Sequence, residues 1–126
     1  VLDKHAQEVL ELAAVVHDIA CPLCRQKYGN ANGKYQEMES PPLVEGFFAG
    51  MPVERDMAER ISWLVAHHHT YTRVDGLDYQ ILLEADFLVN ADEGGLARAA
   101  IENMRQSVFR TGAGVRLLDS IYLREQ

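Results

Sequence analysis

The sequence has little positive charge: 12 Lys and Arg stand against 19 Asp and Glu, with a formal net charge of −7 over 126 residues. Proteins that bind nucleic-acid polymers usually present a basic surface, so this deficit argues against that class of partner. The sequence also has no apolar run long enough to span a membrane and no signal-peptide pattern at its start. We therefore expect a cytoplasmic protein with no membrane partner.

Cysteine is scarce as well. The two cysteines, Cys21 and Cys24, occur in the sequence Cys-Pro-Leu-Cys. A redox CxxC pair normally accompanies a βαβ pattern, and a structural zinc site needs four ligands. Neither context is visible, which favours incidental thiols near the end of a helix. A redox or metal role is the alternative.

The alternating pattern of a β-strand is also missing, and the apolar spacing predicts an all-α bundle of about six helices. Asp3 is expected to cap a first helix that continues to about residue 20, where Pro22 stops it. The polar residues 25–40 are expected to form a loop. The chain length fits a single domain over residues 1–126. Further helices are expected over 41–50, 52–69, 78–90, 96–104 and 115–123.

The apolar run of residues 13–16 ends at a polar pair, His17 and Asp18. Burying an ionised carboxylate is costly unless another group pairs with it. A divalent metal ion would satisfy both side chains, because imidazole and carboxylate are common ligands of such ions. Taken alone, the pair could also be a polar helix end.

A second set of imidazoles and a carboxylate follows. The apolar stripe of the helix expected over 52–69 extends to His68 and His69, and His68 is the better candidate to face inward. Asp86 lies among apolar residues that forecast its burial. Alternatively, the histidines form a solvated helix end, and Asp86 pairs with Arg60 or Arg73.

Three predicted helices could therefore bring His17, Asp18, His68 and Asp86 around one divalent ion. The sequence does not distinguish among Mn, Fe, Co, Ni, Zn and Mg. An ion held this way would lower the pKa of a bound water to about 7 and polarise a phosphoryl oxygen.

The segments VVHDIA, HHHTYTRVDGLDY and LLEADFLVN occur in this order between residues 10 and 93. They resemble the HD-domain superfamily of metal-dependent phosphohydrolases, in particular its small stand-alone bacterial members. The resemblance implies a helical domain of HD type in which His17, Asp18 and Asp86 bind a metal ion.

The same resemblance makes His68 and His69 similar to the paired histidines of two-metal members. Glu39 falls near the position where such members carry another histidine, so it is a candidate oxygen ligand. Family members also have a histidine on a preceding helix. His5 lies about 18 Å from His17 along one expected helix, too far to share the ion. We therefore expect that an N-terminal helix is missing from this sequence.

The expected activity is hydrolysis of a phosphate ester, of a nucleotide or another small phosphorylated metabolite. Asp18 or Asp86 would orient the attacking water, and His68 would bind a second ion or donate to the phosphoryl group. Lys27 and Lys34 could bind phosphate as point charges, or they are solvated loop lysines.

Two other functions remain open. The first is a non-catalytic ligand-sensing or assembly domain with a degraded metal site, and the second is a purely structural helical module. A homodimer is expected if Phe47 and Phe48 are exposed, because exposed apolar patches often mark interfaces.

Overall fold

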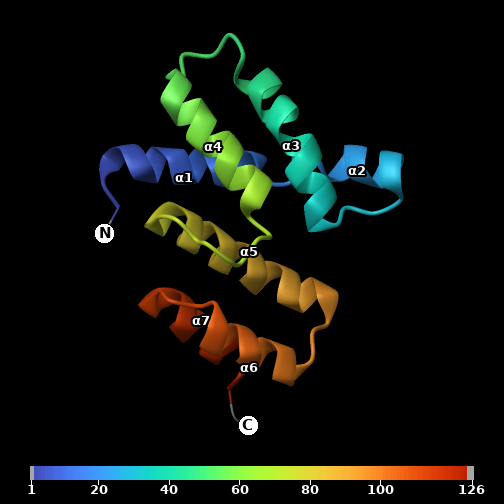
Figure 1. Ribbon diagram of the computed structural model, residues 1–126. Coiled ribbons are helices and arrows are strands. Elements are labelled where there is room, and N and C mark those ends of the chain that lie inside the picture. Colours follow the sequence, from blue (N-terminus) through green and yellow to red (C-terminus); the bar gives the residue numbers. More distant parts are fainter. Residues whose placement is uncertain (1, 125–126) are drawn as a thin grey trace. The chain divides into compact units, whose positions relative to one another are not determined.

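The computed structural model describes residues 2–124, except for the side chains of 93 and 94. These residues form seven α-helices and no strand, which confirms the predicted all-α class (Figure 1). They divide into two compact units, Val1–Thr72 and Arg73–Gln126. The expected single domain stays a prediction. None of the described helices combines the length and apolarity needed to cross a membrane.

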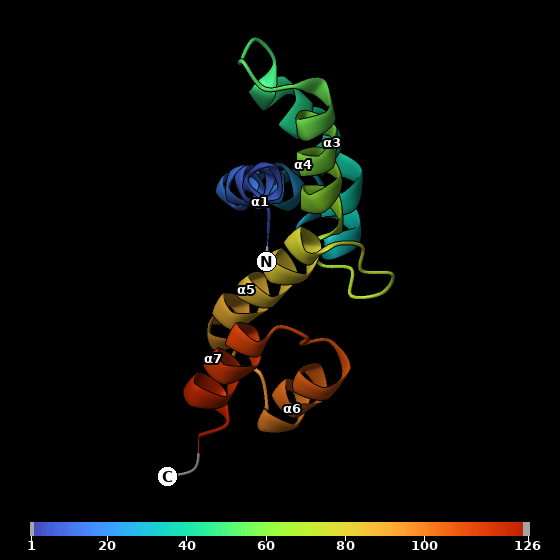
Figure 2. The same cartoon turned by 90° about the vertical axis from the view of Figure 1, so that its left-hand side faces the viewer.

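The first unit contains α1 (Lys4–Val16), α2 (Cys21–Tyr28), α3 (Gly33–Phe48) and α4 (Arg55–His67). α3 packs along α4, and α1, seen end-on in Figure 2, packs across α4. Apolar side chains from these three helices are buried and form the core of the unit: Val9, Ala13, Val44, Ile61, Leu64 and Val65.

α1 begins as predicted but ends earlier. The Asp3 side chain accepts a hydrogen bond from the backbone N–H of Ala6 at 2.7 Å, which confirms the N-cap. The helix ends at Val16, and a turn leads into α2. Pro22 lies in the first turn of α2, where its missing N–H costs no helical hydrogen bond. The prediction that Pro22 ends a helix is therefore wrong, because it begins one.

The expected loop over residues 25–40 is also wrong. Only a short turn separates α2 from α3, and Gly29 allows it with a left-handed φ of 82°. The backbone N–H of Gly29 donates to the carbonyl of Arg25 at 3.0 Å and closes α2. α3 then begins at Gly33.

Two prolines, Pro41 and Pro42, lie inside α3 rather than at its start. Their ring nitrogens cannot donate, so the carbonyls of Glu37 and Met38 receive no helical hydrogen bond from them. Glu37 and Met38 are exposed residues, so we expect water to solvate their carbonyls. Local solvation thus explains how the helix continues through both prolines.

The second unit contains α5 (Leu77–Gly94), α6 (Arg98–Ser107) and α7 (Gly112–Tyr122). They correspond to the last three predicted helices. The rings of Phe87 and Phe109 meet edge to face, with centroids 5.7 Å apart. The core of the unit is formed by Phe87, Ala91, Ile101, Phe109 and Leu118.

A buried carboxylate fixes the start of α7 in this unit. Glu84, only 2% exposed, accepts hydrogen bonds from the backbone N–H groups of Arg110 and Thr111 at 2.9 and 3.1 Å. The Thr111 hydroxyl donates to the other carboxylate oxygen at 2.6 Å. Three donors in the segment before α7 therefore satisfy one buried acidic group on α5.

Candidate metal centre

His17 and Asp18 lie in the turn that follows α1. His17 is the C-cap of the helix, and its Nδ1 donates a hydrogen bond to the carbonyl of Ala14 at 2.7 Å. The opposite nitrogen, Nε2, lies 3.2 Å from Oδ2 of Asp18. The early end of α1 thus turns the His17 ring toward the neighbouring carboxylate.

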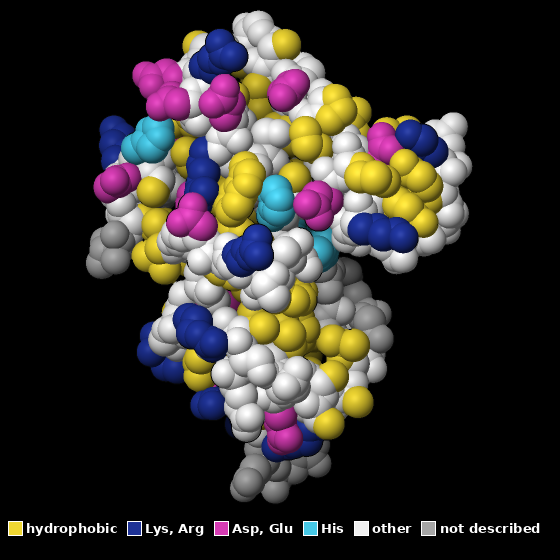
Figure 3. All heavy atoms as spheres, in the orientation of Figure 1, with side chains coloured by type: hydrophobic (Ala, Val, Ile, Leu, Met, Phe, Trp, Pro, Cys, Tyr) yellow, Lys and Arg dark blue, Asp and Glu magenta, His cyan; other side chains and the backbone are white. Residues whose placement is uncertain are grey.

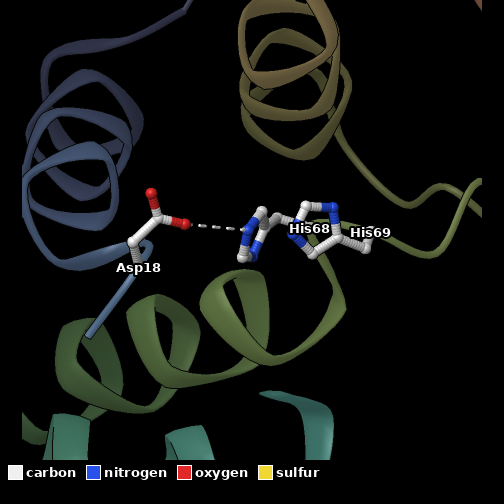
Figure 4. Close-up of side chains that lie close together, drawn as sticks. All are labelled: Asp18, His68 and His69. Carbon is white, nitrogen blue, oxygen red and sulfur yellow. Dashed lines mark ion pairs between the residues drawn. The ribbon is translucent and has the colours of Figure 1, made fainter. Parts of the chain in front are cut away.

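His68 repeats this arrangement at the end of α4. It is the C-cap of α4 and fully buried, as its place on the apolar stripe predicts. Its Nδ1 donates to the carbonyl of Val65 at 2.6 Å, and its Nε2 lies 3.8 Å from Oδ1 of Asp18. Figure 4 shows the Asp18 carboxylate turned toward the His68 ring.

The two histidines therefore present the same atom to the same carboxylate. Because each Nδ1 donates to a carbonyl, Nε2 of the neutral ring carries a lone pair. A lone pair that faces a carboxylate oxygen is repelled unless a proton or a metal ion lies between them. Ligand atoms bound about 2.1 Å from one ion are separated by about 3–4 Å, and the Nε2–oxygen distances of 3.2 and 3.8 Å fall in this range.

His69 extends the cluster. One ligand atom from each of Asp18, His68 and His69 lies within 4.8 Å of the others. Gly33, at the start of α3, lets this helix approach closely, because a Cβ at position 33 would lie 3.0 Å from Cβ of His69. Sequence reasoning missed Gly33, since Gly33 and His69 are far apart in the sequence and meet only because α3 packs against α4.

The charge of the Asp18 carboxylate suits a metal ligand. Without an ion, a proton on Nε2 makes His17 a hydrogen-bond donor to Asp18, and this bond lowers the pKa of Asp18 below its ordinary value, against the opposing effect of partial burial. The Asp18 side chain is 59% exposed, so small molecules can reach it. It is therefore an accessible anion, whereas His68 lies beneath the surface.

The Cys21 thiol also contacts this carboxylate and donates to Oδ1 of Asp18 at 3.7 Å. Burial and the nearby Asp18 charge raise the pKa of Cys21 to about 11. Burial likewise raises the pKa of Cys24. Because a metal ligand or nucleophile must be a thiolate, these directions favour inert thiols over a redox or metal role.

Glu39 and Lys27 form a pair of their own. Lys27 Nζ lies 2.8 Å from Oε2 of Glu39, and the Tyr28 hydroxyl donates to the same oxygen at 2.5 Å. Among the described residues, Glu39 is in no group whose ligand atoms lie close enough to share an ion. Helix formation within residues 25–40 explains this result, because α2 and α3 place the two side chains together.

Two further side chains, Lys34 and His67, contact other parts of the first unit. Lys34 is exposed, with Nζ 5.1 Å from the centre of the Tyr35 ring. His67 turns toward α3, where its Nε2 lies 3.4 Å from Oε1 of Glu37. Of the three consecutive histidines, His68 and His69 therefore form the cluster with Asp18.

Asp86 lies on α5 in the second unit, where it accepts a hydrogen bond from the Asn90 side chain at 2.9 Å. Its expected role as a metal ligand stays a prediction. The cluster described above is built from the first unit alone. No protein-family model, curated protein or solved structure matches this chain.

Proposed function

We propose that this chain is a metal-dependent phosphohydrolase of the HD-domain type that acts on a small phosphate ester. One observation carries the proposal: the Asp18 carboxylate lies between Nε2 of His17 and Nε2 of His68, 3.2 and 3.8 Å away. Imidazole nitrogens with a carboxylate oxygen suit Mn, Fe, Co, Ni or Zn. When bound, such an ion supplies a Lewis acid and lowers the pKa of a coordinated water.

Some residues of the cluster would bind the ion, and others would act on the attacking water. The hydrogen bonds from the Nδ1 atoms of His17 and His68 to backbone carbonyls leave each Nε2 of the neutral ring available, so these two nitrogens would hold the ion. Asp18, anionic and exposed, would hold the ion and orient the attacking water by accepting a hydrogen bond from it. His69 is proposed as a further ligand. Asp86 is proposed as a ligand on the sequence resemblance alone.

Metal binding tests the proposal directly. Asp18→Asn should weaken the affinity for Mn²⁺ or Co²⁺ by at least about tenfold in calorimetric titration, because it removes the anionic ligand. Hydrolysis of a panel of phosphate esters should fall with it. His67→Gln is the matched control, since this neighbouring imidazole faces Glu37. Unchanged metal affinity and turnover in the Asp18 variant would refute the site.

A non-catalytic domain that retains the metal site is the second candidate. The observation that favours it concerns the two lysines expected to bind phosphate, which have other partners. Lys27 pairs with Glu39, and Lys34 lies exposed over the Tyr35 ring. This function predicts metal binding that Asp18→Asn abolishes, with no turnover of any ester in the panel.

A further inference from the structure

A cavity of about 370 Å³, widely open to solvent, lies directly beside the candidate metal ligands of the first unit. Its volume falls within the usual range of small-molecule sites. Two of its lining residues are the proposed ligands His17 and Asp18, and the others are apolar. The full lining is Val15, Val16, His17, Asp18, Ile19 and Phe47.

The apolar wall of this cavity is exposed and pre-positioned. Val15 and Phe47 are 75% and 44% exposed, although both are large apolar side chains. The Phe47 ring packs edge to face on the buried Phe48 ring, with centroids 5.1 Å apart. Figure 3 shows hydrophobic side chains beside histidine and acidic side chains on the surface of this unit. Covering such a wall with an apolar ligand is favourable.

We infer that this cavity binds the alcohol portion of the substrate, and that the substrate is a phosphate monoester of an apolar alcohol. The inference rests on the proposed function, which puts the metal ion, and with it the phosphoryl group, beside Asp18 and His17. The alcohol portion of the ester would then contact Val15 and Phe47. Among the described residues the lining includes no Lys or Arg, so beyond the ion itself it offers no cation to bind the additional phosphates of a nucleoside di- or triphosphate.

The reaction is a simple hydrolysis. The oxygen of water forms a bond to phosphorus, the bond between phosphorus and the ester oxygen breaks, and that oxygen leaves as the alcohol with one proton from the water. Inorganic phosphate is the other product. The apolar alcohol is held by Phe47 and Val15 through its contact area alone, so these two residues determine specificity and take no part in the chemistry.

Benzyl phosphate and glycerol 3-phosphate are suitable test substrates for this specificity. Their alcohols differ strongly in polarity but little in acidity, so a difference in kcat/KM reports binding of the alcohol rather than its ability to leave. With the full chain and Mn²⁺, kcat/KM should be about tenfold higher for benzyl phosphate. Phe47→Ala and Val15→Ser should remove that preference by raising KM, with glycerol 3-phosphate unaffected. Met38→Ala is the matched control, since Met38 is a 57% exposed side chain of α3 outside the cavity lining.

Benzylphosphonate, which cannot be hydrolysed, gives a readout that needs no turnover. The metal-loaded protein should bind it about tenfold more tightly than methylphosphonate, and Phe47→Ala should abolish the difference. Equal affinities, or equal kcat/KM for the two esters with turnover intact, would overturn the pocket and leave the phosphohydrolase standing. If no ester is hydrolysed but benzylphosphonate still binds selectively, the proposed hydrolase activity would be refuted, whereas the proposed binding pocket would be supported. A dimer in sedimentation that Phe47→Ala dissociates would assign the cavity to a second copy and overturn the inference.

Discussion

Replacing Gly114 with alanine should strongly destabilise the second unit. A Cβ at this position would lie 1.8 Å from Oε1 of Glu84 and 2.7 Å from Oγ1 of Thr111. Real Cβ atoms essentially never come closer than 3.0 Å to such atoms, so the carboxylate must move. That movement breaks the hydrogen bonds that Glu84 accepts from the backbone N–H groups of Arg110 and Thr111 at 2.9 and 3.1 Å.

The size of the effect follows from these bonds. A hydrogen bond to a charged group contributes about 1.5–3 kcal/mol, so losing two costs about 3–6 kcal/mol. Alanine is the better helix former, which offsets about 1 kcal/mol at this helical position of α7. We therefore expect the free energy of unfolding to fall by about 2–5 kcal/mol, a large part of the stability of a typical domain.

Urea denaturation followed by circular dichroism measures this change. Gly112→Ala is the matched control at the start of the same helix, where an added Cβ would meet only the flexible end of Arg116 at 3.1 Å. It should change the free energy of unfolding by less than about 1 kcal/mol. A Gly114 variant as stable as the Gly112 variant would show that Glu84 does not hold the segment before α7 in place and would refute the reasoning.

Two further predictions concern the first unit and the surface of the second. Gly33→Ala should displace His69, because the new Cβ would lie 3.0 Å from Cβ of that histidine. Metal affinity measured by calorimetry should therefore fall several-fold. An unchanged affinity would show that His69 is not a ligand. The hydrogen bond from Arg105 lowers the pKa of Asp119 below its ordinary value of 3.8. The pair therefore stabilises the fold above that value, and its contribution disappears as the pH falls through the lowered pKa. The difference in Tm between the wild type and Asp119→Asn should be present at pH 7 and vanish in stronger acid; a difference that does not change with pH would contradict the pairing.

Local patterns were sufficient for the all-α class and for parts of several helices. Asp3 is followed at once by helical spacing, and the structure has its side chain as the N-cap of α1. The apolar stripe of α4 likewise predicts that His68 faces inward, and it is fully buried. Both features depend on residues within a few positions of each other, so the geometry of one helix determines them.

Local patterns failed where one signal has two meanings. Pro22 ends a helix or occupies its first turn, and the choice depends on where the preceding helix stops. Pro41 and Pro42 look like a helix start but lie inside α3. Its buried side chains, such as Val44 and Phe48, provide the packing that outweighs the cost of the two missing donors. The expected homodimer depended on exposure of both Phe47 and Phe48. Phe47 is exposed, but Phe48 is buried and is not available to an interface.

The sequence by itself determined which chemical groups this protein has, that the fold around them is helical, and that His17, Asp18 and His68 are candidate ligands. Only the tertiary structure decided which of these groups meet. The packing of α1 across α4 brings Asp18 to His68, and the packing of α2 against α3 pairs Lys27 with Glu39. The reason is physical: helical periodicity sets the face on which a side chain lies, whereas distances between helices depend on how the whole core packs.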